Sequence, residues 1–122
     1  MSPPPDRRLR RSGDLAVSLR YLLAAQRERA GLTHIALATM DGILLAWDGD
    51  HADCEELAAY APFVARGEAY VLDGRRLAGV TVHSLQAGPD ELVLAFRGEA
   101  PREAVSAAVI SGVEGVVRIL SQ

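Results

Sequence analysis

Six side chains that could bind a metal ion or transfer a proton lie close together between positions 41 and 54. They are Asp41, Asp48, Asp50, His51, Asp53 and Cys54. Carboxylates and imidazoles bind calcium or zinc and act as general acids and bases, and a thiolate can bind zinc or act as a nucleophile. The first question is whether these groups form one site or serve the turns and caps of separate elements.

A calcium-binding loop that begins at Asp48 fails at three positions. The EF-hand pattern needs an oxygen ligand, a glycine and a glutamate where this sequence has Ala52, Asp53 and Ala59. A looser cation site that uses Asp48, Asp50 and Asp53 stays open on the sequence alone.

Zinc and nucleophilic chemistry have still less support. His51 and Cys54 are spaced like half of a zinc site, but His34 and His83 are isolated and the chain has no second cysteine. Neither a nucleophile elbow nor a glycine-rich phosphate loop is present in the sequence. We therefore predict no catalytic residue, cofactor or metal, and keep a metal-dependent enzyme built on His51 and the nearby aspartates only as a third hypothesis.

The aspartates are better explained by local structure. Asp41-Gly42 separates two apolar runs of strand length, residues 33–40 and 43–48, and this pattern predicts a hairpin with a type I′ turn. Asp50, or else Asp53, is expected to cap the helix that follows. Cys54 lies on the apolar stripe of that helix, where a buried and unreactive thiol is expected.

The composition is that of a single globular domain in a reducing compartment. The chain has 122 residues, 49% of them hydrophobic, and a single cysteine, so we predict a cytoplasmic protein without a membrane span. Residues 1–11 hold four arginines against Asp6, a net charge of +3, whereas residues 12–122 hold nine arginines against fifteen acids, a net charge of −6. We predict a disordered basic tail over residues 1–13, a domain over residues 14–122, and no binding of nucleic acid by the acidic domain.

Hydrophobic periodicity predicts three helices around the hairpin and a second strand pair. The first helix is expected to have Asp14 as its N-cap and to stop at Gly31, and its apolar face is formed by Leu15, Leu19, Leu22, Leu23 and Ala30. The second helix follows position 50, with a kink or break at Pro62. Residues 77–86 and 91–98 read as strands, and Pro101 begins the last helix. Whether residues 68–72 and 115–120 are strand or helix stays open.

The segments "GLTHIALATMDGILLAWDGD" and "CEELAAYAPFVARG" together resemble the roadblock (dynein light-chain) family. Bacterial members related to the gliding-motility GTPase-activating protein are the most similar. The likeness covers residues 14–98 well and the C-terminal part loosely. The sequence departs from the family pattern at Pro62, inside a helix that is usually continuous, and before residue 77, where a clear strand is missing.

The resemblance implies an α/β (α+β) fold of the profilin-like type. A mostly antiparallel sheet would carry the second helix on one face and the first and last helices on the other. It also implies a homodimer or paralogous heterodimer that forms through the second helix and an edge strand. The residues expected at this interface are Leu57, Tyr60, Ala61, Phe63 and Val64, although the aromatic ones could instead fill the core, as we expect Trp47 to do.

These expectations lead to a hypothesis of function. A non-enzymatic, dimeric interaction module would bind and regulate a Ras-like small GTPase or a signalling or polarity scaffold. The alternative is a small-molecule-sensing domain of the profilin-like type, with an internal polar pocket that holds His34 or His83.

Overall fold

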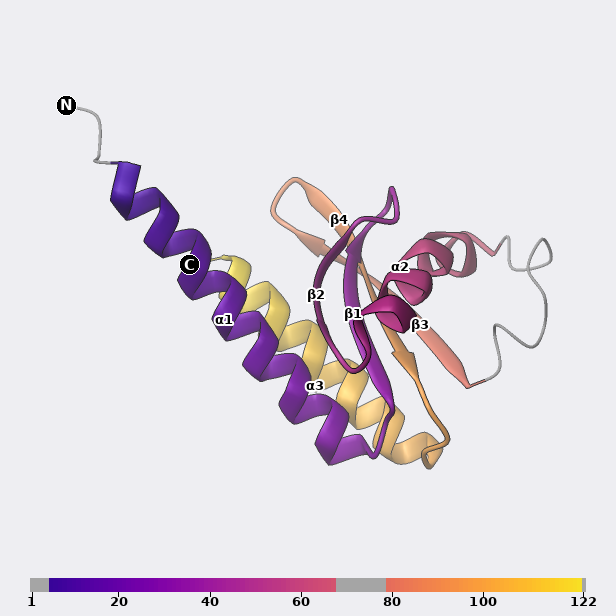
Figure 1. Cartoon of the computed structure of the whole chain (residues 1–122). Coiled ribbons are helices and arrows are strands. Elements are labelled where there is room, and N and C mark those ends of the chain that lie inside the picture. Colours follow the sequence, from indigo (N-terminus) through magenta and orange to yellow (C-terminus); the bar gives the residue numbers. More distant parts are fainter. Residues whose placement is uncertain (1–4, 68–78, 122) are drawn as a thin grey trace.

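The computed structural model describes residues 5–67 and 79–121, with side chains from residue 14 onward. The chain folds into three helices and four strands in the predicted order (Figure 1). The elements are α1 (Pro5–Ala30), β1 (His34–Thr39), β2 (Leu44–Asp48), α2 (His51–Ala65), β3 (Val80–Ala87), β4 (Asp90–Arg97) and α3 (Arg102–Leu120). Residues 68–72, whose conformation the sequence left open, lie outside the described residues.

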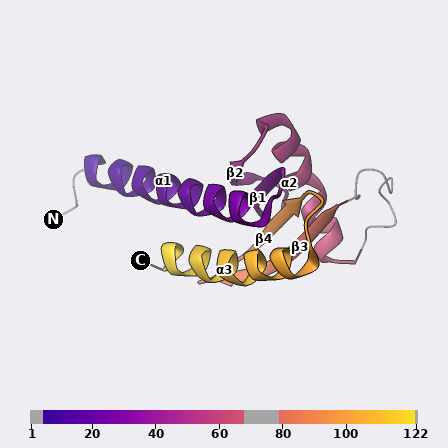
Figure 2. The same ribbon diagram turned by 90° about the horizontal axis from the view of Figure 1, so that it is seen from below.

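The four strands form one antiparallel sheet in the order β2-β1-β4-β3. Helix α2 covers one face of this sheet, and α1 and α3 lie side by side on the other (Figures 1 and 2). The predicted sandwich is therefore confirmed, with β2 and β3 as the outer strands among the described residues.

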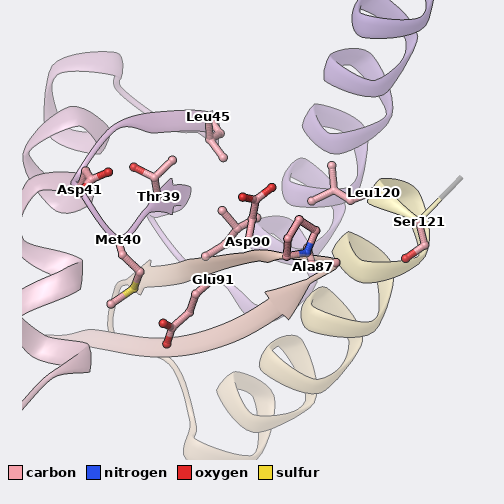
Figure 3. Close-up of a pocket in the computed structure, with 12 residues that line it drawn as sticks. Thr39, Met40, Asp41, Leu45, Ala87, Asp90, Glu91, Leu120 and Ser121 are labelled. Carbon is pink, nitrogen blue, oxygen red and sulfur yellow. The ribbon is translucent and has the colours of Figure 1, made fainter.

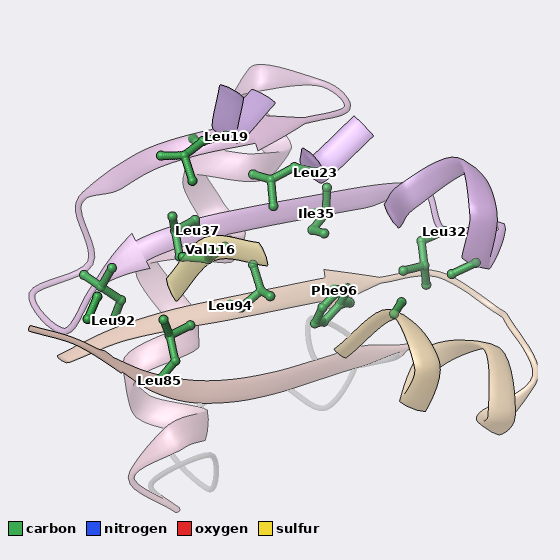
Figure 4. Close-up of a cluster of buried hydrophobic side chains, with 14 residues drawn as sticks. Leu19, Leu23, Leu32, Ile35, Leu37, Leu85, Leu92, Leu94, Phe96 and Val116 are labelled. Atoms are coloured by element: carbon green, nitrogen blue, oxygen red, sulfur yellow. The ribbon is translucent and has the colours of Figure 1, made fainter. Parts of the chain in front are cut away.

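The central strand β1 contacts both helical layers, which explains why its sequence is apolar without alternation. Ile35 and Leu37 point into the larger cluster of buried side chains, between the sheet and α1 and α3 (Figure 4). Ala36 points the other way, into a smaller cluster beneath α2 that also includes Leu57 and Val93.

Helix α1 ends as predicted but begins earlier. Gly31 adopts φ +71°, and the amides of Gly31 and Leu32 donate to the carbonyls of Glu28 and Arg27, which closes the helix in a Schellman motif. The helix begins at Pro5, so the prediction of Asp14 as its N-cap is wrong, and the predicted tail overlaps the first turns of α1. The apolar pattern that predicts the helix falls within residues 14–30. No hydrophobic periodicity therefore marks the helical turns that come before it.

The two helices on the same face approach each other closely at small residues of α3. A Cβ atom at Gly115 would lie 2.7 Å from a methyl group of Leu22 on α1, so only glycine fits there without a shift. Beside this contact, the Gln26 amide donates to Ser111 Oγ at 2.8 Å, which satisfies the one buried polar side chain among the described residues.

Proline and glycine in the other helices have weaker effects than expected. Helix α2 continues through Pro62 to Ala65, so no break occurs at the proline, and the Arg66 amide donates to the Pro62 carbonyl at 3.0 Å. Residues 115–120 belong to α3, which settles the open choice in favour of helix. Pro101 is the N-cap of α3 and lies just before its first turn.

Within the part of the chain that the structure describes, we find no helix with the length and apolar character needed to cross a membrane.

Candidate interaction surface

The hairpin between β1 and β2 turns at the predicted dipeptide but with a different geometry. Gly42 has φ +85°, whereas Asp41 has a negative φ, so the predicted type I′ turn is wrong. The Gly42 amide donates to the Thr39 carbonyl at 3.0 Å, and the Thr39 amide donates to the Ile43 carbonyl at 2.9 Å. This is the pattern of a longer turn that ends in a left-handed glycine. Asp41 is exposed at its tip.

The remaining aspartates each have a partner of their own. Asp48 forms an ion pair with Arg27 of α1, and this hydrogen bond raises the pKa of the guanidinium. Asp50 is the N-cap of α2 and accepts from the Asp53 amide at 3.1 Å, which confirms the first of the two predicted caps. The carboxylate of Asp53 lies 3.2 Å from His34 Nε2.

The histidine of the cluster is also engaged elsewhere. His51 stacks on Trp47 with ring centroids 4.4 Å apart, and its Nε2 lies 3.0 Å from a Glu55 carboxylate oxygen. Residues 5–67 and 79–121 contain no group of three or more histidine, cysteine or acidic side chains arranged to hold a metal ion. The residues between 41 and 54 are thus not brought together into one site.

Cys54 lies on the inner side of α2 and is buried, as predicted. Its side chain is 0% exposed, and Sγ is 3.8 Å from the Ile35 carbonyl and 3.6 Å from the Asp48 carbonyl. Burial, followed by the nearby carboxylates of Asp48 and Asp53, raises the pKa of the thiol to about 11. A thiol that stays protonated at neutral pH and has no access to solvent is a poor nucleophile.

Helix α2 divides the five predicted interface residues into two groups. Leu57 and Ala61 are 0% and 1% exposed and pack against the sheet, so they belong to the core and cannot contact a partner. Phe63 is 38% exposed, and Tyr60 and Val64 are partly buried. The prediction therefore placed part of the apolar stripe at the interface, although this stripe faces inward.

The outer side of α2 is short, acidic and carries one large apolar side chain. Ala52, Glu55, Glu56 and Ala59 are exposed there along with Phe63. The Tyr60 hydroxyl donates to Glu56 Oε1 at 2.9 Å, which holds the ring along the helix. Phe63 is the largest exposed hydrophobic side chain on this face of the described structure.

A groove lies between the β1–β2 turn, the β3–β4 turn and the C-terminal end of α3 (Figure 3). It has a volume of about 710 Å³, and its walls include Leu45, Asp90, Glu91 and Leu120. The polar pocket expected for a sensing domain would hold His34 or His83, but neither residue lines this groove.

Further exposed apolar side chains were not predicted. These are Val17, Tyr21, Ile43 and Leu45, which are 51%, 75%, 60% and 44% exposed. The available signal was Tyr21, because it falls off the apolar stripe of α1 that Leu19 and Leu23 define.

Comparisons with known proteins find similarity in structure alone. No protein-family model matches the sequence, and no curated protein sequence matches it. The gliding protein MglB from Thermus thermophilus aligns with a TM-score of 0.61 and 20% identity, over 88% of this chain and 91% of that chain. An MglB structure with a tetrameric arrangement gives a TM-score of 0.61 and 19% identity, over 88% of this chain and 90% of that one.

A further similar structure is the Roadblock/LC7 domain from Streptomyces avermitilis. It aligns with a TM-score of 0.62 and 19% identity, over 84% of this chain and 98% of that domain. At these identities the likeness establishes the fold, so the resemblance to the roadblock family is confirmed at that level.

Proposed function

We propose that this chain is a non-enzymatic interaction module that dimerises and regulates a Ras-like small GTPase, or else a signalling or polarity scaffold. The observation that carries the proposal is the fold, a sandwich that this chain shares with MglB gliding proteins and a Roadblock/LC7 domain. In this proposal residues 14–122 act as one domain in the cytoplasm.

The surface proposed for dimerisation is the outer side of α2 around Phe63, flanked by Tyr60 and Val64. Aromatic side chains set among small residues are typical anchors of protein interfaces, because they bury a large area with little loss of side-chain entropy. The partner is a second copy or a paralogue with a matching helix. Self-association is supported by the tetrameric arrangement of one structurally similar MglB.

The proposed regulation requires binding alone. A module without catalytic groups changes nucleotide turnover when it binds one conformation of the partner's nucleotide-dependent loops more tightly than the other. The clustered acids of this chain are engaged in caps and ion pairs, as Asp48 and Asp50 show, and this supports binding rather than chemistry as the role of the domain.

The dimer is tested by sedimentation velocity at low micromolar concentration. We expect the wild-type chain to sediment as a dimer and Phe63→Glu to shift toward the monomer, because a carboxylate replaces the apolar anchor. Ile110→Glu is the matched control, since Ile110 is 61% exposed on α3, on the opposite face of the sheet. A wild-type monomer, or equal masses for the two variants, would contradict the α2 dimer.

Partner binding is tested with small GTPases encoded near the gene of this chain. Each is immobilised with GDP or with a non-hydrolysable GTP analogue and then incubated with purified chain. Binding that differs between the two nucleotide states supports the proposal. If none of these GTPases binds in either nucleotide state, the proposal of a GTPase partner is contradicted, and a scaffold is the next partner to test.

A further inference from the structure

The groove shown in Figure 3 is formed by three parts of the chain that lie far apart in the sequence. The β1–β2 turn, the β3–β4 turn and the C-terminal end of α3 enclose a volume of about 710 Å³. Most of its lining residues are exposed, so it is an open depression of the surface and not an enclosed cavity. Small molecules usually bind in pockets that bury most of their surface, so an open groove fits a polypeptide segment better.

The two turns beside the groove are constrained by their own residues. The β3–β4 turn consists of Gly88 and Pro89 alone, and the proline ring fixes one backbone torsion angle. In the β1–β2 turn, the Thr39 hydroxyl accepts a hydrogen bond from the Ile43 amide at 3.1 Å. Groups carried by such turns are already positioned before a ligand arrives, which lowers the entropic cost of binding.

The charged residues that line this groove are all acidic. They are Asp41 from the β1–β2 turn and Asp90 and Glu91 from the start of β4, and each is exposed. The end of α3 adds the partial negative charge of a helix C-terminus, and Arg118 of its last turn does not line the groove. None of the three carboxylates forms an ion pair with another described side chain. The groove is therefore a region of negative potential.

Aliphatic side chains line the groove beside these carboxylates. Leu45 of β2 is 44% exposed and points into the groove, and Leu120 at the end of α3 borders it (Figure 3). Leu92 of β4 also lines the groove and is buried. Figure 3 shows the carboxylates of Asp41 and Asp90 directed into the same space. An occupant therefore contacts negative charge and aliphatic surface together.

These carboxylates are not arranged to hold a single metal ion. Among residues 14–67 and 79–121, no three acidic, histidine or cysteine side chains are placed to share one. Carboxylates distributed over two turns match an occupant whose positive charges are distributed as well. Arginine and lysine side chains of a polypeptide supply such charges, together with aliphatic stems that pack on an apolar wall. Charge complementarity thus selects a basic polypeptide segment.

We propose that this groove binds a basic segment of a partner protein, in which arginine or lysine residues lie next to an apolar one. The basic side chains pair with Asp41 and Asp90, and the apolar side chain packs against Leu45 and Leu120. No residue of α2 lines the groove. The site is therefore independent of the proposed α2 dimer and of the proposed GTPase.

The test measures the binding of a fluorescently labelled peptide, in which arginines flank a central leucine, to the full chain by fluorescence anisotropy. A second peptide with glutamine in place of each arginine is the control for binding through apolar contact alone. We expect the arginine peptide to bind and the glutamine peptide not to bind. If the arginine peptide does not bind, or if both peptides bind equally, the proposal is wrong.

Two double variants separate this groove from general attraction to an acidic protein. Asp41→Asn/Asp90→Asn removes two negative charges from the groove. Glu99→Gln/Glu103→Gln removes two exposed charges near the start of α3, where Glu103 lies about 25 Å along the helix from the groove. We expect the first variant to bind the arginine peptide about ten-fold more weakly and the second to bind it as the wild type does. An equal loss in both would overturn the proposal.

The aliphatic part of the groove is tested without a change of charge. Leu45→Gln should weaken peptide binding about five-fold, because it removes an apolar side chain that is 44% exposed before the peptide covers it. Ile43→Gln is the matched control, since Ile43 is 60% exposed on the same hairpin but lines a different groove. Binding to Leu45→Gln that equals binding to the wild type would show that the peptide does not occupy this groove.

Three checks complete the experiment. Circular dichroism confirms that each variant is folded, and all substituted positions are exposed in the structure. Phe63→Glu should bind the arginine peptide as the wild type does, because Phe63 does not line the groove. A failure of the α2 dimer is then read from sedimentation and a failure of this site from the peptide.

Discussion

Cys54 shows how the surroundings of one side chain decide its chemistry. In the sequence, the thiol lies close to His51 and several aspartates, which suggests a metal ligand or a nucleophile. In the fold, it faces the sheet from the inner side of α2 and has the Ile35 and Asp48 carbonyls as partners. Its burial was predictable from the periodicity of α2. Burial is the main cause of the raised pKa, and only the smaller contribution of Asp48 and Asp53 was not predictable, because the sheet and the helix cap bring these carboxylates near.

We predict that Cys54 does not react with a thiol-specific reagent at pH 8 in the native protein and reacts at once when the protein is unfolded. The folded pKa of about 11 exceeds the ordinary value of 9.0, so the thiol stabilises the fold fully below pH 9 and loses this contribution as pH rises toward 11. The free energy of unfolding should fall over this window by about 2 kcal/mol more than in Cys54→Ala. Fast native labelling, or equal pH profiles for the two proteins, would refute the assignment.

The sequence predicted the helices and strands more accurately than the turns that connect them. Gly31 and Asp50 are predictable as a stop and a cap because their roles rest on local chemistry that the sequence displays. The turn at Asp41-Gly42 is located correctly but assigned the wrong type, since the same two residues fit a two-residue turn and a longer one. In the structure, the backbone hydrogen bonds that join Thr39 to Gly42 and to Ile43 define the longer turn.

The junction between β4 and α3 allows a prediction at the scale of the elements. Gly98 has φ +150°, and a Cβ there would lie 2.9 Å from the Thr33 amide nitrogen and 3.1 Å from Leu32 Cα. Both are backbone atoms of the segment that enters β1, so Gly98→Ala must push that strand aside. We expect a loss of about 2–4 kcal/mol in the free energy of unfolding, measured in urea.

Gly88→Ala is the control for this change. Gly88 also has a positive φ of +61°, but a Cβ atom added there would have no other atom within 4 Å, so only the backbone strain of about 1–2 kcal/mol applies. If the free energy of unfolding falls equally in the two variants, the close contacts at Gly98 do not add to the cost of the substitution.

At the scale of the whole molecule, the sequence predicted the layers but not which apolar residues each layer leaves exposed. Leu57 and Ala61 lie on the apolar stripe of α2 and are buried, whereas Phe63 lies off that stripe and is exposed. Sequence reasoning therefore led to α2 as the helix proposed for the dimer and did not single out Tyr21 or Leu45, which are 75% and 44% exposed.

The two faces of the sheet also differ in how firmly their helices are held. Among the described residues the cluster under α1 and α3 contains fourteen buried side chains, whereas the one under α2 contains six, three of them alanines. Because apolar burial is the main source of stability, α2 should open before α1 and α3 do. A partner on the outer side of α2 would raise the cost of that opening.

Hydrogen exchange followed by mass spectrometry measures this coupling. We expect amides of α2 to exchange faster than those of α3, and their protection to rise about ten-fold for each hundred-fold increase in protein concentration, because opening must first separate two protomers. Protection of α3 should not change with concentration. In Phe63→Glu the dependence should disappear from α2, while in Ile110→Glu it should persist. Protection of wild-type α2 that is independent of concentration would show that no partner copy covers this helix.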